Sequence, residues 1–316
     1  MKAYIHKCST LSVLDSFNGG ILSKLKNSSS HVLIEPAYKE IITGSYLRRM
    51  SKVIKMGVAA AITAAKDQNI QGIVVGSGAG CCHNTVLFIG EYNERQEEIL
   101  SPHSFIQSTD NTIAGQIALI LQNFSYNITY IQKGLAFENA LVDAVLLSEE
   151  NNAGILIGGV DEWIPLFELG ETTKALHPEY WIGEGAGFFI LSQAKQNALA
   201  LISACGILQS KPDSIENELH SFLDEHQLEI PDLILYGNSF VNEVSIDIDL
   251  LNVKTVHYSD ICGIYFTNTA FGMNLGTEIL THPSLAKENG FNAKRILIVN
   301  NFNDADWGVI YLSALS

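Results

Sequence analysis

The segment NITYIQKGLAFENAL, residues 127–141, has the residue order of a short strand, a tight turn and the start of a helix. Such a turn can present a nucleophile to a substrate, because backbone N–H groups at a helix N-terminus stabilise negative charge. This turn, however, holds Gln132, Lys133 and Gly134, and neither a cysteine nor a serine. An amide is not a nucleophile and a surface lysine is protonated at neutral pH, so neither residue replaces a thiolate.

The cysteines elsewhere in the chain do not form a recognisable site. There are five, at positions 8, 81, 82, 205 and 262, and they lack metal-ligand spacing. Scattered reduced thiols are therefore expected rather than a disulfide framework. Cys81 and Cys82 are neighbours, but adjacent residues rarely bind one metal ion, and no base is visible beside them or beside Cys262. We expect packed thiols, no metal site and no cofactor.

The glycine-rich turn GSGAG, residues 76–80, follows a β-branched run and does not predict a phosphate site. It lacks the spacing and lysine of a P-loop and the last glycine of a dinucleotide fingerprint. Ser77 within it also lacks the frame of a serine-hydrolase elbow. Close backbone approach or a positive φ angle is the better interpretation of these glycines.

Composition limits the classes of partner. The chain has 316 residues, of which 47% are hydrophobic, and 19 Lys and Arg against 34 Asp and Glu give a net charge of −15. Such a charge opposes binding to nucleic acid or to an anionic membrane, and we expect neither as a partner. The sequence contains no uninterrupted apolar run of about 18 residues, which favours a cytoplasmic protein.

The elements that would position the turn alternate between helix and strand. Apolar spacing predicts a helix over 47–66, with Arg48, Arg49, Lys52 and Lys55 on another face, which we interpret as a solvated basic stripe. Further along the chain we expect strands at 72–80, 127–132, 154–163, 183–193, 231–239, 294–302 and 307–313, and helices at 110–122, 135–150, 214–228 and 269–280. This pattern indicates an α/β protein.

Taken in order, the glycine motifs resemble a known family. Six segments over about residues 45–195 resemble the successive landmarks of the β-ketoacyl synthases. They are RRMSK, GSGAG, NTIAGQIAL, the turn ending in NAL, GGVDE and GEGAGFFIL. The resemblance implies a thiolase-like fold, in which two similar βαβ-rich halves stack in five layers, αβαβα. It divides the chain into an N-terminal half, 1–195, and a shorter C-terminal half, 196–316, which share one core, and it implies dimerisation.

The resemblance also implies a reaction, decarboxylative Claisen condensation, whose nucleophile is missing here. The family cysteine lies seven residues before the leucine of the NAL-type end, and counting back from Leu141 reaches Gly134. An offset of one or two residues reaches Lys133 or Gln132, and a glutamine there resembles the non-condensing chain-length factors of the family.

The two family histidines are not found either. At the corresponding turns the sequence has Gly237, Asn238 and Ser239, and then Gly263 and Ile264. His257 lies near the second turn but its spacing fits poorly. The segment NNFNDADWG brings Asp304 and Asp306 into a loop that is glycine-rich in the family. We therefore expect a catalytically silent subunit of type II fatty-acid, polyketide or aryl-polyene biosynthesis.

The resemblance suggests how such a subunit would act. It would pair with a condensing ketosynthase, or with a second copy of itself, and shape the acyl tunnel. The net charge of −15 leaves the docking of an acidic acyl carrier protein mainly to the partner. Strand 127–132 resembles the strand that crosses the dimer axis, and residues 101–110 resemble a loop that reaches the partner's tunnel. The candidate tunnel or interface residues are Phe105, Ile106, Asn111, Ile128, Tyr130 and Gln132.

Other interpretations remain open from the sequence. Phe105 and Ile106 fit ordinary dimer packing as well as they fit a tunnel wall. The chain could also be an active acyltransferase or condensing enzyme with a displaced nucleophile such as Cys81 or Cys82. As a third alternative, it could be a homodimeric scaffold that binds an acyl chain or a carrier protein.

Overall fold

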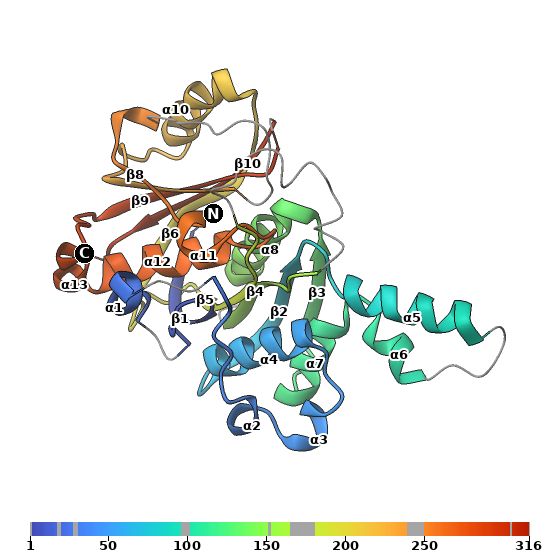
Figure 1. Ribbon diagram of the computed structural model, residues 1–316. Coiled ribbons are helices and arrows are strands. Elements are labelled where there is room, and N and C mark those ends of the chain that lie inside the picture. The colour runs from blue at the N-terminus through green and yellow to red at the C-terminus, as the bar shows by residue number, and fades with distance from the viewer. Residues whose placement is uncertain are drawn as a thin grey trace.

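Ten strands form one mixed sheet within the residues that the computed structural model describes, which are 2–17, 20–27, 31–95, 102–150, 153–164, 181–238, 250–303 and 305–315. The strands lie in the order β3-β2-β4-β5-β1-β6-β10-β9-β7-β8 (Figure 1). Their bounds are β1 Ala3–Leu11, β2 Ile70–Ser77, β3 Tyr126–Ile131, β4 Gly154–Asp161, β5 Gly185–Ser192, β6 Ala200–Gln209, β7 Leu233–Asn238, β8 Thr255–His257, β9 Arg295–Asn301 and β10 Asp306–Ser313.

The helices connect and cover these strands. The α-helices are α1 Ile21–Lys24, α2 Tyr38–Ile41, α3 Gly44–Leu47, α4 Lys52–Ala65, α5 Cys82–Arg95, α6 Pro102–Gln107, α7 Thr112–Leu121, α8 Ala136–Glu150, α10 Ile215–Glu225, α11 Ser259–Cys262, α12 Thr269–Thr281 and α13 Pro283–Glu288. Short 3-10 turns occur at η1 Leu25–Asn27, η2 Lys133–Leu135, η4 Pro212–Ser214 and η5 Leu250–Asn252.

The strand order repeats the same topology twice. In the first half, β1 pairs antiparallel with β5, β5 antiparallel with β4, β4 parallel with β2, and β2 parallel with β3. In the second half, β6, β10, β9, β7 and β8 pair with the same directions in the same order. The halves join through a short antiparallel contact between β1 and β6. Two similar βαβ-rich halves are thus present, as the family resemblance implies.

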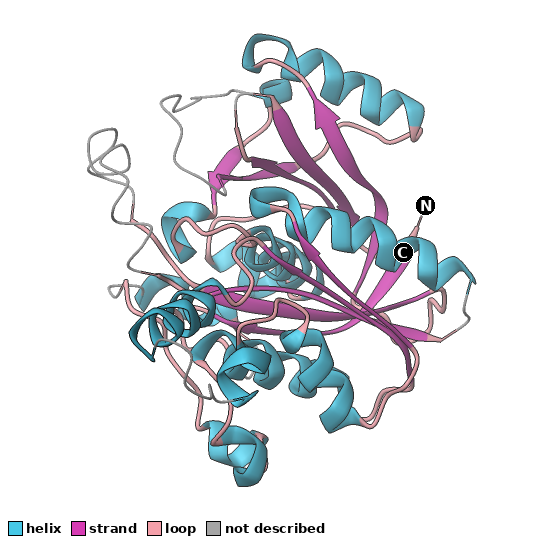
Figure 2. Cartoon of the chain, turned by 90° about the vertical axis from the view of Figure 1, so that its right-hand side faces the viewer, coloured by secondary structure: helices cyan, strands magenta, loops and turns pink. Residues whose placement is uncertain are grey.

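Helices lie outside and between the two halves of the sheet. Helices α4 and α7 cover the outer face of the first half, and α10 covers that of the second half. Helices α8 and α12 lie between them, since α8 contacts β2, β4 and β6, and α12 contacts β5 and β9. Figure 2 shows these helices above, between and below the strands. This five-layered αβαβα arrangement confirms the predicted thiolase-like fold.

The composition of the helices fits these layers. Helix α10 buries Ile215, Leu219 and Phe222, the apolar face that its spacing predicts, and exposes acidic residues to solvent. Helix α12 is buried all round from Thr269 to Leu280, as expected of a helix covered by strands on both sides. The main core cluster includes residues of both halves. The boundary predicted at 195/196 lies between the end of β5 and the start of β6. The division into halves 1–195 and 196–316 stays a prediction.

Two local expectations are wrong. The predicted helix 47–66 begins only at Lys52, because the chain turns after α3, so Arg48 and Arg49 precede the helix and do not form a stripe with Lys52 and Lys55. Lys52 also forms an ion pair, since its Nζ lies 2.5 Å from Glu184 Oε1 while 40% of its side chain stays exposed. The segment 101–110, expected as a loop, contains the short helix α6.

Gly76 is required for the packing of β2 against α8. A Cβ atom there would lie 2.6 Å from the carbonyl oxygen of Ala136 and 2.9 Å from Cα of Phe137, which are backbone atoms that cannot rotate away. We expect Gly76→Ala to lower the free energy of unfolding by about 2 to 3 kcal/mol, measured by urea denaturation. The control is Gly206→Ala in β6, whose nearest atom would be 4.0 Å away. Equal losses in both variants would contradict this explanation.

Candidate functional site

The turn between β3 and α8 has the strand–turn–helix form that the sequence predicts. Strand β3 ends at Ile131, and α8 begins at Ala136 after the turn η2. Lys133 has a φ of 51°, in the left-handed region that is costly for a residue with a side chain. Gln132 and Lys133 are exposed and Gly134 is buried. Which of these three residues corresponds to the family nucleophile stays a prediction, and none of them carries a thiol or a hydroxyl group.

A buried polar cluster fixes this turn from the second half of the chain. The side-chain amide of Asn300, in β9, donates to the carbonyl oxygen of Gly134 at 2.9 Å and to Glu138 Oε1 at 2.7 Å. The hydroxyl of Thr269, at the start of α12, also donates to Glu138 Oε1, at 2.7 Å. Tyr258 donates in turn to Thr269. The turn is therefore held by contacts that need both halves to be folded.

The electrostatics of Glu138 favour a structural role. Burial raises its pKa to about 7, while the hydrogen bonds from Thr269 and Asn300 act in the opposite direction. Its second oxygen, Oε2, has no hydrogen-bond partner. A carboxyl group that is closed off beneath the turn can position the backbone there, but it has no contact with a nucleophile to activate.

A second buried carboxylate occupies the glycine-rich turn. Asp161, at the end of β4, accepts hydrogen bonds from the backbone N–H groups of Gly78 and Ala79, at 2.9 and 3.0 Å from Oδ1. The hydroxyls of Ser77 and Thr267 also donate to it, at 3.0 and 2.8 Å. The GSGAG turn thus binds the carboxylate of the GGVDE landmark, which explains its conformation without a phosphate ligand.

The environment of the thiols does not activate them. Burial, with the negative charges of Asp110 and Glu162, raises the pKa of Cys81 to about 12. The pKa of Cys82 is raised by the same causes. Burial also raises the pKa of Cys262 well above its ordinary value. Nucleophilic cysteines need a lowered pKa, so these environments oppose thiolate formation.

The positions that resemble the family histidine turns are tied into backbone packing. The carbonyl oxygen of Asn238 accepts a hydrogen bond of 2.7 Å from the amide of Asn268. Gly263 has a φ of 81° and lies against Gly183. His257, in β8, packs edge-on against Tyr236 with 5.1 Å between ring centroids. Among the later landmarks, Asp306 begins β10, whereas Ser239 and Asp304 lie outside the described residues.

The candidate tunnel and interface residues lie along one side of the first half. Phe105 and Ile106 are on α6, and 57% and 51% of their surfaces are exposed. Ile128 and Tyr130 are half-buried on β3, and Asn111 is exposed before α7. Strand β3 is an edge strand, and α5 and α6 extend from the body of the molecule (Figure 1). Ile128 and Tyr130 pack against the core that contains α8, whereas Phe105 and Ile106 are exposed on α6, and the structure does not itself test their roles.

Several apolar residues of α5, α6, α7 and β3 are exposed, and we call this set the α5–β3 surface. Helix α5 and the edge strand β3 lie at its two ends, and the ring of Phe88 packs against that of Phe105 with centroids 5.7 Å apart. Its exposed apolar residues are Val86, Leu87, Ile89, Tyr92, Phe105, Ile106, Leu119, Phe124, Tyr126 and Ile131. Clusters of exposed apolar residues can mark interaction sites in soluble proteins, and this set is the candidate for one here.

The sequence reasoning missed the residues that fix the turn. Glu138 and Asp161 lie inside the quoted landmarks, but their partners Thr269, Asn300 and Thr267 come from the second half. The signal that could have found Asp161 is an acidic residue directly after a buried apolar strand. Among the described residues, no three His, Cys, Asp or Glu side chains gather as a metal site would require. None of the described helices is long and apolar enough to cross a bilayer.

Comparison with known proteins agrees with this architecture. Residues 36–179 match the family model of the β-ketoacyl synthase N-terminal domain. No curated protein matches the sequence. Among solved structures, the chain is similar to the ishigamide ketosynthase/chain length factor, with a TM-score of 0.79 and 13% identity over 100% of both chains.

Two further solved structures share the fold. One is AntDE:AntF, a type II polyketide synthase acyl-carrier protein in complex with its ketosynthase, with a TM-score of 0.74 and 15% identity over 99% of both chains. The other is a β-ketoacyl synthase from Burkholderia phymatum STM815, with a TM-score of 0.73 and 14% identity over 99% of this chain and 100% of that one. The resemblance inferred from the sequence is confirmed.

Proposed function

We propose that this chain, whose residues 36–179 match the β-ketoacyl synthase N-terminal domain, is a catalytically silent subunit that pairs with a condensing synthase. In that pair it shapes the acyl or polyene tunnel, in the manner of a chain-length factor in type II fatty-acid, polyketide or aryl-polyene biosynthesis. The observation that carries the proposal is the turn after β3. The position where the family nucleophile is expected holds Gln132, Lys133 and Gly134, and the turn lacks a thiol.

The buried cluster supports this proposal. Where an active turn would need a thiolate and donors for an oxyanion, Asn300 uses its amide hydrogens on Gly134 and Glu138. The raised pKa values of Cys81 and Cys82 argue against a displaced nucleophile in the neighbouring loop. The fold is retained and its chemistry is absent, which is the expected state of a structural partner.

The exposed surface supports pairing. The α5–β3 surface combines apolar side chains with an edge strand, and both features are normally covered in a stable assembly. Phe105 and Ile106 lie on α6, at the side from which they could reach a partner. We assign them to the wall of the partner's acyl tunnel, and Ile128, Tyr130 and Gln132 to the interface along β3.

A condensing chain is the partner that this surface needs. A pair of two identical copies would contain no nucleophile at either turn, whereas a mixed pair would contain one. The ishigamide structure is a ketosynthase/chain length factor, and the AntDE:AntF structure adds an acyl-carrier protein. In the mixed pair, an acyl carrier protein would deliver the acyl groups. It would dock mainly on the condensing subunit, because carrier proteins are acidic and this chain carries a charge of −15.

The test is co-expression with the condensing synthase encoded nearest to this chain, followed by size-exclusion chromatography and a malonyl-carrier condensation assay. We expect a stable mixed dimer whose product length or rate depends on this chain. Replacing the synthase's own cysteine should abolish condensation, while replacing Cys81 and Cys82 here with serine should leave it unchanged. Condensation by this chain alone would refute the proposal, and a homodimer that ignores the synthase would favour a scaffold.

The same experiment tests the interface. Phe105→Asp places a charge on the α5–β3 surface and should weaken the mixed dimer at least about tenfold. The matched control is Val32→Asp, which changes an apolar residue that is 71% exposed and lies outside that surface. Equal effects of the two substitutions would place the interface elsewhere.

A further inference from the structure

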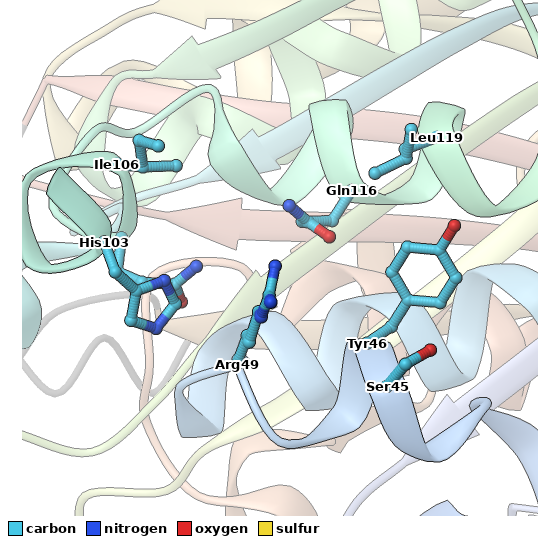
Figure 3. A pocket seen from close by; sticks show the side chains of 8 residues that line it. Ser45, Tyr46, Arg49, His103, Ile106, Gln116 and Leu119 are labelled. Atoms are coloured by element: carbon cyan, nitrogen blue, oxygen red, sulfur yellow. The ribbon is translucent and has the colours of Figure 1, made fainter.

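A pocket between α3, α6 and α7 shares Ile106 with the proposed tunnel wall, but its polar side chains have no part in that function. Its volume is about 360 Å³, room for a small organic molecule. Figure 3 shows Arg49 and His103 side by side at this pocket, with Gln116 and Tyr46 opposite them. The side chains come from three separate segments, so the pocket exists only in the folded chain.

The polar side chains of the pocket can all donate hydrogen bonds. Arg49 has no carboxylate partner among the described residues, in contrast to Lys52, which pairs with Glu184 at 2.5 Å. Gln107 is only 7% exposed, and its Oε1 accepts a hydrogen bond from the backbone of Ser51 at 3.3 Å. Its two amide hydrogens therefore remain available, and no acceptor for them occurs among the described residues. The Nε2 atom of Gln107 is not among the fully buried polar atoms without a partner, so it is open to the pocket, where it can donate to a ligand.

The charge of the pocket comes from Arg49. The described residues that line it include no aspartate or glutamate, although the adjoining cavity that shares Arg49 and His103 contains Glu91. An arginine with a neighbouring imidazole and two amides matches the acceptor oxygens of a carboxylate or a phosphate.

One wall of the pocket is apolar. Ile106 and Leu119 line it, and their side chains are 51% and 53% exposed in this chain. A ligand with a short hydrocarbon group next to its anionic head would cover them, whereas a bare inorganic ion would not. Burial of that group would add to the affinity in proportion to its area.

We propose that this pocket binds a small organic anion, a carboxylate or a phosphate monoester with a short apolar group. Arg49 and His103 bind the anionic head with Gln107, and Ile106 and Leu119 contact the apolar part. The proposal shares Ile106 with the proposed interface, but it can be tested on the unpaired chain because every residue of the pocket belongs to this chain.

The test is isothermal titration of the full chain with n-butyl phosphate, hexanoate and inorganic phosphate at low and at physiological salt. We expect saturable 1:1 binding of at least one organic anion, more tightly than inorganic phosphate. The affinity should fall as salt is added, because screening weakens the contact with Arg49. The two organic probes distinguish a phosphate ligand from a carboxylate ligand.

Three substitutions separate the pocket from a general charge effect. Arg49→Gln and His103→Ala should each weaken binding, the former about tenfold or more. Leu119→Ala should weaken n-butyl phosphate or hexanoate and leave inorganic phosphate unchanged. The matched control is Lys66→Gln, which removes one exposed positive charge at the far end of α4, about 20 Å along the helix, beyond the screening length.

Two results would overturn the proposal. The first is no saturable binding of either organic anion at millimolar concentration. The second is equal weakening by Arg49→Gln and Lys66→Gln, which would show a nonspecific charge effect. If Arg49→Gln instead weakens only the mixed dimer, the pocket receives an acidic side chain of the partner, and a small-molecule site is refuted. A failed titration leaves the condensation assay unaffected, so the two proposals fail separately.

Discussion

Replacing Asp161 with alanine is expected to lower the free energy of unfolding by about 4 kcal/mol, the largest effect that we anticipate for a single substitution. Asp161 is 1% exposed and accepts hydrogen bonds from two backbone N–H groups and two hydroxyls. Alanine would leave these donors buried without an acceptor. The cost comes from the donors that remain, more than from the loss of the carboxylate itself.

The loss should spread across both halves of the chain. The donors Ser77, Gly78 and Ala79 lie at the end of β2 and in the turn after it, whereas Thr267 lies two residues before α12. The carboxylate thus connects the carboxyl end of a first-half strand to the start of a central helix. A single cooperative transition at lower denaturant concentration is therefore expected, and not the loss of one half only.

Equilibrium denaturation by urea, followed by tryptophan fluorescence, measures the effect. Two milder variants test the explanation. Asp161→Asn keeps one acceptor oxygen and should cost about half as much, and Thr267→Val removes a single donor and should cost about 1 kcal/mol. If alanine costs no more than Thr267→Val, the carboxylate is not the centre of this network.

The sequence predicts the local features of the turn correctly because they depend on neighbouring residues. The run NITYIQ forms β3, the following residues form a turn, and the missing thiol is read directly from positions 132–134. The alternation of apolar strands and helices likewise predicts an α/β protein, since each element needs an apolar face or a buried run, whereas the αβαβα layers follow from the family resemblance. These inferences need no knowledge of distant contacts.

The residues that fix the site could not be predicted in the same way. Glu138 stands in the first turn of a helix, where an acidic residue is normally explained by the helix dipole and left in solvent. Here it is 2% exposed and bonds to Thr269 and Asn300, which are 131 and 162 residues away in the chain. Lys52 is similar, because its partner Glu184 is 132 residues away. Pairing across the two halves is a tertiary property that no local pattern encodes.

Glu138 should also make the stability of the protein depend on pH. Burial raises its pKa from 4.5 to about 7. The folded state therefore keeps a proton that the unfolded state loses, so Glu138 stabilises the fold most below about pH 4.5 and loses this contribution as the pH rises to about 7. Between pH 5.5 and 8 the contribution of Glu138 to the free energy of unfolding should fall by about 2 kcal/mol.

Glu138→Gln isolates this contribution, because a glutamine keeps the acceptor oxygen for Thr269 and Asn300 but does not titrate. Urea denaturation at several pH values should show a shallower pH dependence in this variant, by about 2 kcal/mol between pH 5.5 and 8. Burial also raises the pKa values of Asp161 and Glu162, to about 6 and about 7. Both residues titrate in the wild type and in Glu138→Gln, so their contributions to the pH dependence cancel when the two proteins are compared.

Thr269→Val provides the opposite test. It removes a donor that favours the ionised form of Glu138, so the pKa of Glu138 should rise further and the pH dependence should become steeper. Parallel stability curves for the wild type and Glu138→Gln would show that Glu138 is ionised throughout this range. Its carboxylate would then hold the turn after β3 as a charge, and the hydrogen bonds from Thr269 and Asn300 would have to compensate for its burial.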